Sequence, residues 1–164
     1  MTVAAVRAKQ RQATPSLSKQ RLRLWIRILR AARAIEAEVR ERLRVEFKVT
    51  LPQFDVMAAL ERKPDGMTMT ELSRFLMVSN GNVTGIIDRL AAEGMVVRLA
   101  HQGDRRATFV RLTPKGAQQF AAMAKAHEAW IVELLAGVGR EDTDTLVGLL
   151  GALSAPAHGG RQNA

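Results

Sequence analysis

The chain contains no cysteine among its 164 residues, and this absence excludes several kinds of chemistry. A protein without thiols has no disulfide, no cysteine nucleophile, no thiolate metal site and no thiol redox sensor. Its three histidines stand far apart in the sequence and form no metal-binding motif. We therefore expect neither a metal ion nor another cofactor.

Long apolar runs are also missing. No stretch approaches the roughly 18 consecutive apolar residues that a membrane-spanning helix needs, and the basic N-terminus lacks the apolar core of a secretory signal. With 47% apolar and 25% charged residues, the composition is typical of a folded domain. The sequence predicts a soluble, cytoplasmic protein built on one compact domain with extensions.

Acidic residues are scarce in the first third of the chain. Residues 1–50 hold 13 basic and 4 acidic side chains, which alone accounts for the net charge of +9 of the whole chain. Such an excess indicates a polyanionic partner, which can be a nucleic acid, acidic lipid or a phosphorylated ligand. A basic surface that serves only solubility stays open as the alternative.

Apolar periodicity predicts a long helix after a short arm. Residues 1–18 show no apolar period and predict a flexible basic arm. From Lys19 apolar residues recur at spacings of three and four over nearly 30 residues. A helix of that length, at about 1.5 Å per residue, is too long for a small monomer to cover, which favours a partner subunit.

Capping signals predict two short helices in tandem. Thr68-Met69-Thr70-Glu71 is a capping box before a helix that runs to about Met77, and Ser79 can cap the next helix, which stops at Gly94. Two short helices with a tight connection are typical of a helix-turn-helix. A period of two then predicts a β-hairpin up to Leu112, with Asp104-Arg105-Arg106 at its tip.

The predicted fold class is mainly α with a small β-hairpin wing. It combines a winged helix-turn-helix lobe with a helical dimerisation region, since Thr113-Pro114 opens one further long helix and another runs from about Glu141 to Leu153. The predicted segments are a flexible basic arm (1–18), the first dimerisation helix (19–50), the winged lobe (51–113), C-terminal dimerisation helices (114–156) and a disordered tail (157–164).

The second short helix and the wing carry the candidate DNA contacts, because in winged helix-turn-helix proteins they enter the major and the minor groove. Asn pairs best with adenine, and a Thr methyl can touch the thymine methyl. The helix candidates are Ser79, Asn80, Gly81, Asn82, Thr84, Gly85 and Arg89. At the wing, we expect Arg106 to enter a narrow minor groove with Asp104 orienting it, and Arg105 to contact phosphate. The alternative for the wing is a solvated turn with a weak salt bridge.

Two glycines in that helix need a physical reason, because each costs about 0.8–1.0 kcal/mol relative to alanine. We hypothesise that Gly81 and Gly85 let the helix backbone approach the duplex closely. The alternative is that Gly81 belongs to a loose first turn and that Gly85 is merely tolerated.

An ordered set of motifs from Leu51 to Gly116 resembles the MarR family of bacterial transcriptional regulators. These motifs are Gln53-Phe54-Asp55-Val56-Met57-Ala58-Ala59-Leu60, Thr70-Glu71-Leu72-Ser73, Val83-Thr84-Gly85-Ile86-Ile87-Asp88-Arg89-Leu90, Gly94-Met95-Val96, Asp104-Arg105-Arg106 and Val110-Arg111-Leu112-Thr113-Pro114-Lys115-Gly116. The resemblance implies a homodimer on a pseudo-palindromic DNA operator, with interleaved first and last helices. It also implies that Asp104 and Arg106 form the wing's Asp-x-Arg pair. The chain departs from many relatives at Gly85, where they carry arginine, and its lack of cysteine excludes the family's peroxide sensing.

The resemblance is to the branch that regulates aromatic catabolism, which implies an aromatic acid or an aromatic acyl-CoA thioester as effector. Large apolar side chains that can line its cleft are Trp25, Phe54, Met57 and Trp130, and arginines that can meet its anionic group are Arg23, Arg27 and Arg30. The alternative is that these apolar residues are ordinary core. The predicted function is a ligand-responsive repressor.

Other functions find less support in the sequence. The motifs of nucleotide-binding, metalloprotease and serine-hydrolase enzymes are missing, so we do not expect an enzyme. A winged-helix module that binds DNA without sequence preference, or binds proteins, and has no small-molecule effector remains the alternative.

Overall fold

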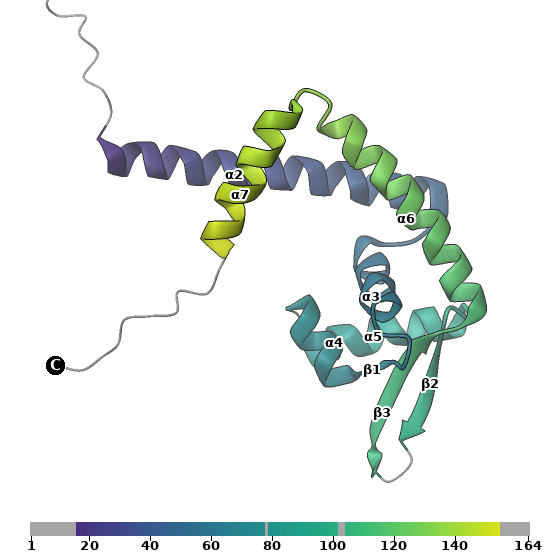
Figure 1. Cartoon of the computed structure of the whole chain (residues 1–164). Coiled ribbons are helices and arrows are strands. Elements are labelled where there is room, and N and C mark those ends of the chain that lie inside the picture. The colour runs from purple at the N-terminus through teal and green to yellow at the C-terminus, as the bar shows by residue number, and fades with distance from the viewer. Residues whose placement is uncertain (1–15, 78, 102–103, 155–164) are drawn as a thin grey trace, which may run out of the picture. The chain divides into compact units, whose positions relative to one another are not determined.

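A computed structural model describes residues 16–77, 79–101 and 104–154, without the side chains of residues 80, 100, 101, 104–108 and 154 (Figure 1). The predicted arm lies outside these residues except for its last three, and the predicted tail lies wholly outside them. The chain divides into two compact units, residues 1–52 and residues 53–164.

The first unit is one long helix, as the apolar period predicts. Helix α2 (Leu17–Arg42) begins two residues before the predicted start and continues into a single π-helical turn, η1 (Leu43–Phe47). Lys48 then ends the helix in the left-handed conformation, with φ 57°. Val39 and Leu43 are buried, whereas large apolar side chains of the N-terminal half are exposed, with Leu22 at 59% and Trp25 at 56%. The described chain therefore leaves a broad apolar face of α2 uncovered.

The second unit begins with three helices and a small sheet. The helices are α3 (Leu51–Glu61), α4 (Met69–Leu76) and α5 (Asn80–Ala92), and the strands are β1 (Met67–Thr68), β2 (Val96–His101) and β3 (Asp104–Leu112). The sheet is antiparallel in the order β1-β3-β2. Strand β1 was not expected from the sequence, because two residues are too few to show a period; pairing of Met67 with Val110 creates the strand.

The core of this lobe collects the apolar stripe of each helix. Val83, Ile87 and Leu90 of α5 are fully buried, and their spacings of four and three residues place them on one side of the helix. Other large, fully buried side chains of the lobe are Val56, Met57, Leu60, Leu72 and Val110. Burying side chains of this size contributes about 1.5–3 kcal/mol each, so the core fixes which face of α5 points outward.

Two more helices follow the sheet. Helix α6 (Pro114–Leu134) begins as predicted, since the Thr113 hydroxyl accepts a hydrogen bond from the Gly116 N–H at 3.0 Å. It buries Met123 and Trp130. Helix α7 (Arg140–Ser154) confirms the last predicted helix, and Leu149 and Leu153 on it are 61% and 70% exposed.

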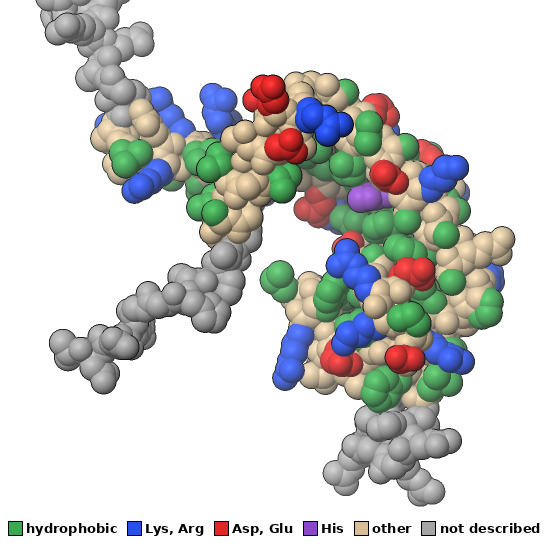
Figure 2. Space-filling view, viewed as in Figure 1, with side chains coloured by type: hydrophobic (Ala, Val, Ile, Leu, Met, Phe, Trp, Pro, Cys, Tyr) green, Lys and Arg blue, Asp and Glu red, His purple; other side chains and the backbone are tan. Residues whose placement is uncertain are grey.

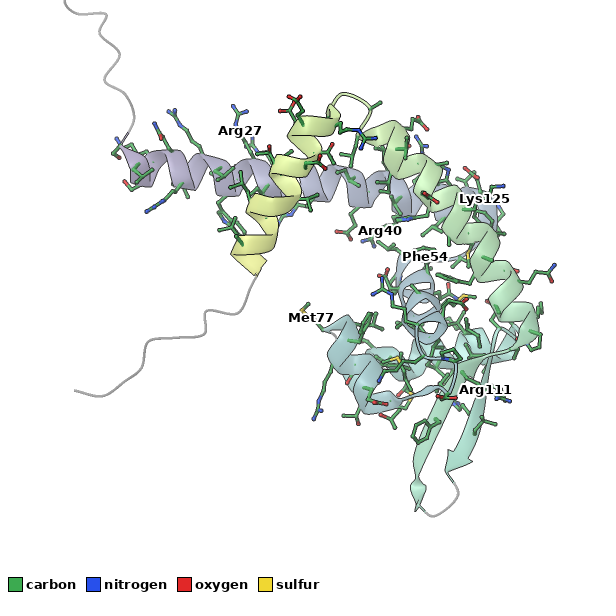
Figure 3. The ribbon with its side chains drawn as sticks, in the orientation of Figure 1. Arg27, Arg40, Phe54, Met77, Arg111 and Lys125 are labelled. Atoms are coloured by element: carbon green, nitrogen blue, oxygen red, sulfur yellow. The ribbon has the colours of Figure 1, made fainter. Side chains whose placement is uncertain are left out.

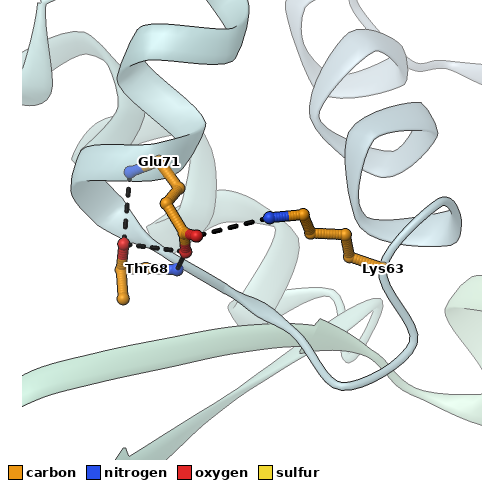
Figure 4. Close-up of polar contacts among 3 residues, drawn as sticks. All are labelled: Lys63, Thr68 and Glu71. Atoms are coloured by element: carbon orange, nitrogen blue, oxygen red, sulfur yellow. Dashed lines mark hydrogen bonds and ion pairs between the residues drawn. The ribbon is translucent and has the colours of Figure 1, made fainter.

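The predicted capping box at the start of α4 is present and is extended by a lysine (Figure 4). The Glu71 carboxylate accepts the Thr68 N–H at 2.8 Å and the Thr68 hydroxyl at 3.0 Å, and the Lys63 ammonium lies 3.3 Å away. These hydrogen bonds from Thr68, followed by the Lys63 contact, lower the pKa of Glu71 from its ordinary value of 4.5. The charged form of Glu71 is therefore the one that the fold stabilises.

We expect Glu71→Gln to reduce the acid sensitivity of the fold. A carboxylate with a lowered pKa adds stability that is fully present above pH 4.5 and is lost as the pH falls through the lowered value. Glutamine keeps the acceptor of the capping box but does not titrate. The free energy of unfolding of the variant, measured by urea titration, should therefore change less between neutral pH and acid. The control is Glu61→Gln at the end of α3; an equal reduction there would contradict the prediction.

Candidate nucleic-acid interface

The helix-turn-helix is formed by α4, α5 and their connection. Met77 ends α4 in the left-handed conformation, with φ 52°, and Ser79 then caps α5 by accepting the Asn82 N–H at 3.4 Å. Val83, Ile87 and Leu90 are buried along one side of α5, so the opposite side of the helix faces outward. The predicted contact residues on this face, all exposed, are Gly81, Asn82, Thr84, Gly85 and Arg89. The Ser79 residue is exposed as well, and the side chain of Asn80 lies outside the described residues.

The two glycines of α5 have no packing role within the described chain. A Cβ atom at Gly81 or Gly85 would meet no other atom within 4 Å. By contrast, a Cβ at Gly66, where φ is +98°, would lie 2.8 Å from the carbonyl oxygen of Val110. The fold therefore requires glycine at position 66 but does not require it on the outward face of α5.

The wing is the antiparallel pair of β2 and β3. Its register pairs Val96 with Leu112 and continues to Ala100 and Thr108, beyond which an irregularity brings His101 opposite Asp104. The backbone of Asp104, Arg105 and Arg106 belongs to strand β3 and not to the turn, so the predicted position of the tip is wrong; of the three, Asp104 alone has a ladder partner in the register, His101. Their side chains lie outside the described residues, and the Asp104–Arg106 pair stays a prediction.

An ion pair that the sequence analysis missed joins the recognition helix to the wing. The Arg98 guanidinium of β2 donates to the Asp88 carboxylate of α5 at 2.6 Å. The signal was present, because Asp88 falls on the outward face of α5 and Arg98 on the polar side of an alternating strand. Both side chains remain partly exposed, so the pair contributes little to stability. It places a cation beside the one carboxylate of α5, which otherwise repels DNA phosphates.

We expect Arg98→Gln to weaken DNA binding by up to about fivefold, because a partly exposed ion pair is worth about 1 kcal/mol at most. The loss should affect all DNA sequences alike, since the uncompensated Asp88 carboxylate repels phosphates. Asp88→Asn in the same chain should restore binding. Fluorescence anisotropy on the two single variants and the double variant tests this coupling. Independent, additive effects would contradict it.

Three of the apolar effector candidates are buried within the second unit. Phe54, Met57 and Trp130 are buried at 7%, 0% and 7% exposure, which supports the alternative that they are core. The ring of Phe54 packs in a tilted arrangement against the rings of Phe120 and His127 of α6, with centroid distances of 5.5 and 5.0 Å.

On helix α2, the aromatic effector candidate and the three arginine candidates lie on different sides. A helix turns by about 100° per residue, which puts Trp25 about 160° away from Arg23 and on the side opposite Arg27 and Arg30. Arg21, which the sequence analysis did not select, stands four residues before Trp25 and is its neighbour on the same side.

The described part of the chain contains no cluster of three or more metal-ligating side chains. Of the helices that the structure describes, none is long and apolar enough to cross a membrane.

Comparisons with known proteins point to one family. The profile of the MarR family matches residues 47–107. The chain is 32% identical over 132 residues to the transcriptional activatory protein BadR of Rhodopseudomonas palustris, covering 72% of this chain and 70% of that protein.

Solved structures agree. A MarR family transcriptional regulator from Silicibacter pomeroyi is 33% identical, with a TM-score of 0.69 over 86% of this chain and all (100%) of that one. A cysteine-to-serine mutant of MarR from E. coli, solved in complex with operator DNA, is 26% identical, with a TM-score of 0.73 over 85% of this chain and 99% of that one. The winged helix-turn-helix and these likenesses together show that the chain belongs to the MarR family of DNA-binding transcriptional regulators.

Proposed function

We propose that the protein is a homodimeric, ligand-responsive repressor that an aromatic acid, or its acyl-CoA thioester, releases from a pseudo-palindromic operator. The observation that carries the DNA-reading part is the outward face of α5, where Asn82 and Thr84 stand beside two glycines that the chain's own packing does not require. Side chains of these types read base edges in the major groove. An operator-binding regulator of this kind acts where the DNA is, which is the cytoplasm in a bacterium.

The dimer proposal rests on uncovered apolar surface at both ends of the described chain. Leu22 and Leu24 of α2 are more than half exposed, as are Leu149 and Leu153 of α7. Soluble proteins seldom leave so many large apolar side chains exposed to water. In a symmetric dimer, a second copy of the same chain covers them. A two-fold dimer then places two recognition helices on half-sites about 34–36 Å apart, which makes the operator a pseudo-palindrome.

The effector proposal uses the apolar side of α2. Trp25 offers an exposed aromatic face there, and Arg21 stands beside it as a cation for a carboxylate. We propose that effector binding near this pair lowers operator affinity by favouring a dimer whose recognition helices are wrongly spaced. Phe54, Met57 and Trp130, which are buried in the second unit, have no part in this proposal.

The test begins with selection of binding sites from a random duplex library, followed by titration of the complex with benzoate, other aromatic acids and their CoA thioesters. We expect a palindromic site that survives excess competitor DNA, and release by at least one compound. Binding that falls uniformly with salt and shows no selected site supports instead the module without sequence preference. Tighter binding on addition of the ligand overturns release, and the relative named as an activatory protein makes that outcome a specific one to look for.

A further inference from the structure

The N-terminal half of α2 carries a row of cations that base reading by α5 does not use. We call these residues the basic ridge: Lys19, Arg23, Arg27 and Arg30. Their spacings of four, four and three residues place them on one side of the helix, within an arc of about 80° at about 100° per residue. All four are exposed, and Figure 2 shows blue side chains projecting from this part of α2.

In the C-terminal half of the same helix, the arginines form ion pairs with glutamates. Arg40 is paired with Glu36, Arg42 with Glu38 at 2.7 Å, and Arg44 with Glu41 at 2.6 Å. Within the described residues, no such pair holds a cation of the basic ridge. Figure 3 shows Arg27 reaching away from the helix, on a different side from Arg40. The first carboxylate of the whole sequence is Glu36, so the ridge has no acidic neighbour in its own segment.

This arrangement disfavours the isolated helix, because like charges three or four residues apart repel each other. Lys19 faces Arg23, Arg23 faces Arg27, and Arg27 faces Arg30 at these spacings. A bound polyanion reverses the repulsion and turns the row into a favourable contact. The ridge therefore has the charge pattern of a surface whose partner is missing.

The shape of the ridge selects the kind of anion. Small-molecule sites are concave and enclose the ligand, whereas these four side chains spread over about 17 Å of the outside of a helix. A small carboxylate touches one or two of them, and an extended polyanion touches all. A membrane surface fits less well, because Trp25 and the apolar side needed for insertion lie opposite the ridge.

We propose that the basic ridge binds the phosphate backbone of duplex DNA, as a contact separate from base reading by α5. The proposal rests on the chain being a DNA-binding regulator, and does not depend on an effector or on release. Backbone contacts carry no sequence information, so the ridge adds affinity to operator and non-operator DNA equally.

The test compares two double variants of the full chain that each remove two positive charges from α2. Arg23→Gln/Arg27→Gln alters the ridge, and Arg40→Gln/Arg44→Gln alters exposed arginines of the ion-paired half. Affinity is measured against salt concentration on a duplex that carries the selected site and on a shuffled duplex of equal length. We expect the ridge variant to flatten the slope of log K against log salt by about 0.9 per lost phosphate contact, thus about 1.8 per chain, on both duplexes.

Further arms distinguish a phosphate contact from helix unfolding, membrane binding and effector binding. Arg23→Lys/Arg27→Lys keeps the charges and should keep the slope, and the circular dichroism of every variant should show an intact helix. An unchanged slope, or one that the ion-paired control flattens equally, overturns the proposal. A ridge variant that keeps the salt slope but loses binding to phosphatidylserine vesicles also overturns it, because the partner of the ridge is then a membrane. A variant that keeps the slope but loses release by an aromatic acyl-CoA does the same, because the partner is then the effector.

Discussion

Replacing Gly116 by alanine is expected to destabilise the protein by about 3 kcal/mol, at the upper end of the usual cost of overpacking a well-packed site. A Cβ at this position would lie 2.0 Å from the carbonyl oxygen of Met95 and 2.9 Å from its carbonyl carbon. Both atoms belong to the backbone, so no side-chain rotation relieves the clash. The first turn of α6 must therefore move away from the segment that enters β2.

That movement breaks a joint built from several hydrogen bonds. The Thr113 N–H donates to the Met95 carbonyl oxygen at 3.0 Å, the Thr113 hydroxyl donates to the Gly94 carbonyl oxygen at 2.7 Å, and the Lys115 ammonium donates to the Glu93 carbonyl oxygen at 2.8 Å. These bonds tie the start of α6 to the end of α5, where Gly94 turns the chain with φ +73°.

Thermal and urea unfolding at one fixed protein concentration measure the effect, since the stability of the proposed dimer would depend on concentration. The control is the same substitution at Gly85, which meets no atom within 4 Å and should instead gain about 0.8–1.0 kcal/mol from the better helix propensity of alanine. Opposite signs at the two glycines are the expected result. A Gly116→Ala protein as stable as the wild type would show that the helix shifts freely, and that the joint contributes little.

The contrast between these glycines also shows what local sequence signals can and cannot predict. The caps at Thr68, Ser79 and Thr113 were predictable because each depends on residues within three positions of the cap. The close approach of Gly116 to Met95 was not, because it joins residues that only the tertiary fold brings together. Strand β1 could not be predicted either, because it forms only by pairing with β3, where Val110 lies far along the chain from Met67.

The same contrast between local signals and tertiary contacts applies to the candidate site. The outward face of α5 follows from the apolar stripe of one helix, so exposure of Asn82 and Gly85 could be predicted from sequence alone. The effector candidates required knowing which side chains share one surface. A single helix already separates Trp25 from Arg23, and the buried Phe54 meets α6 residues far away in the sequence. Residue types alone do not supply that information.

Introducing a leucine at Gly85 is expected to lower operator affinity by about 100-fold or more while leaving the protein folded. The position is exposed and empty, so the side chain costs nothing within the described chain. If the helix backbone approaches the duplex there, leucine holds it away and removes base contacts by Asn82 and Thr84. Two contacts at about 1–3 kcal/mol each make a loss of that size. Gly85→Ala should show a smaller loss, together with its gain in stability.

The matched control is Ala92→Leu, which adds bulk to an exposed position on the same helix two turns later, where a recognition helix leaves the bases. Anisotropy titrations on the selected and the shuffled duplex separate the possible causes. Close approach predicts that Gly85→Leu loses the selected duplex far more than the shuffled one, because phosphate contacts remain. Equal affinity of Gly85→Leu and wild type for the selected site would mean that Gly85 is merely tolerated. The preference of α5 for its operator would then rest on side chains that reach the bases without a close approach of the helix backbone.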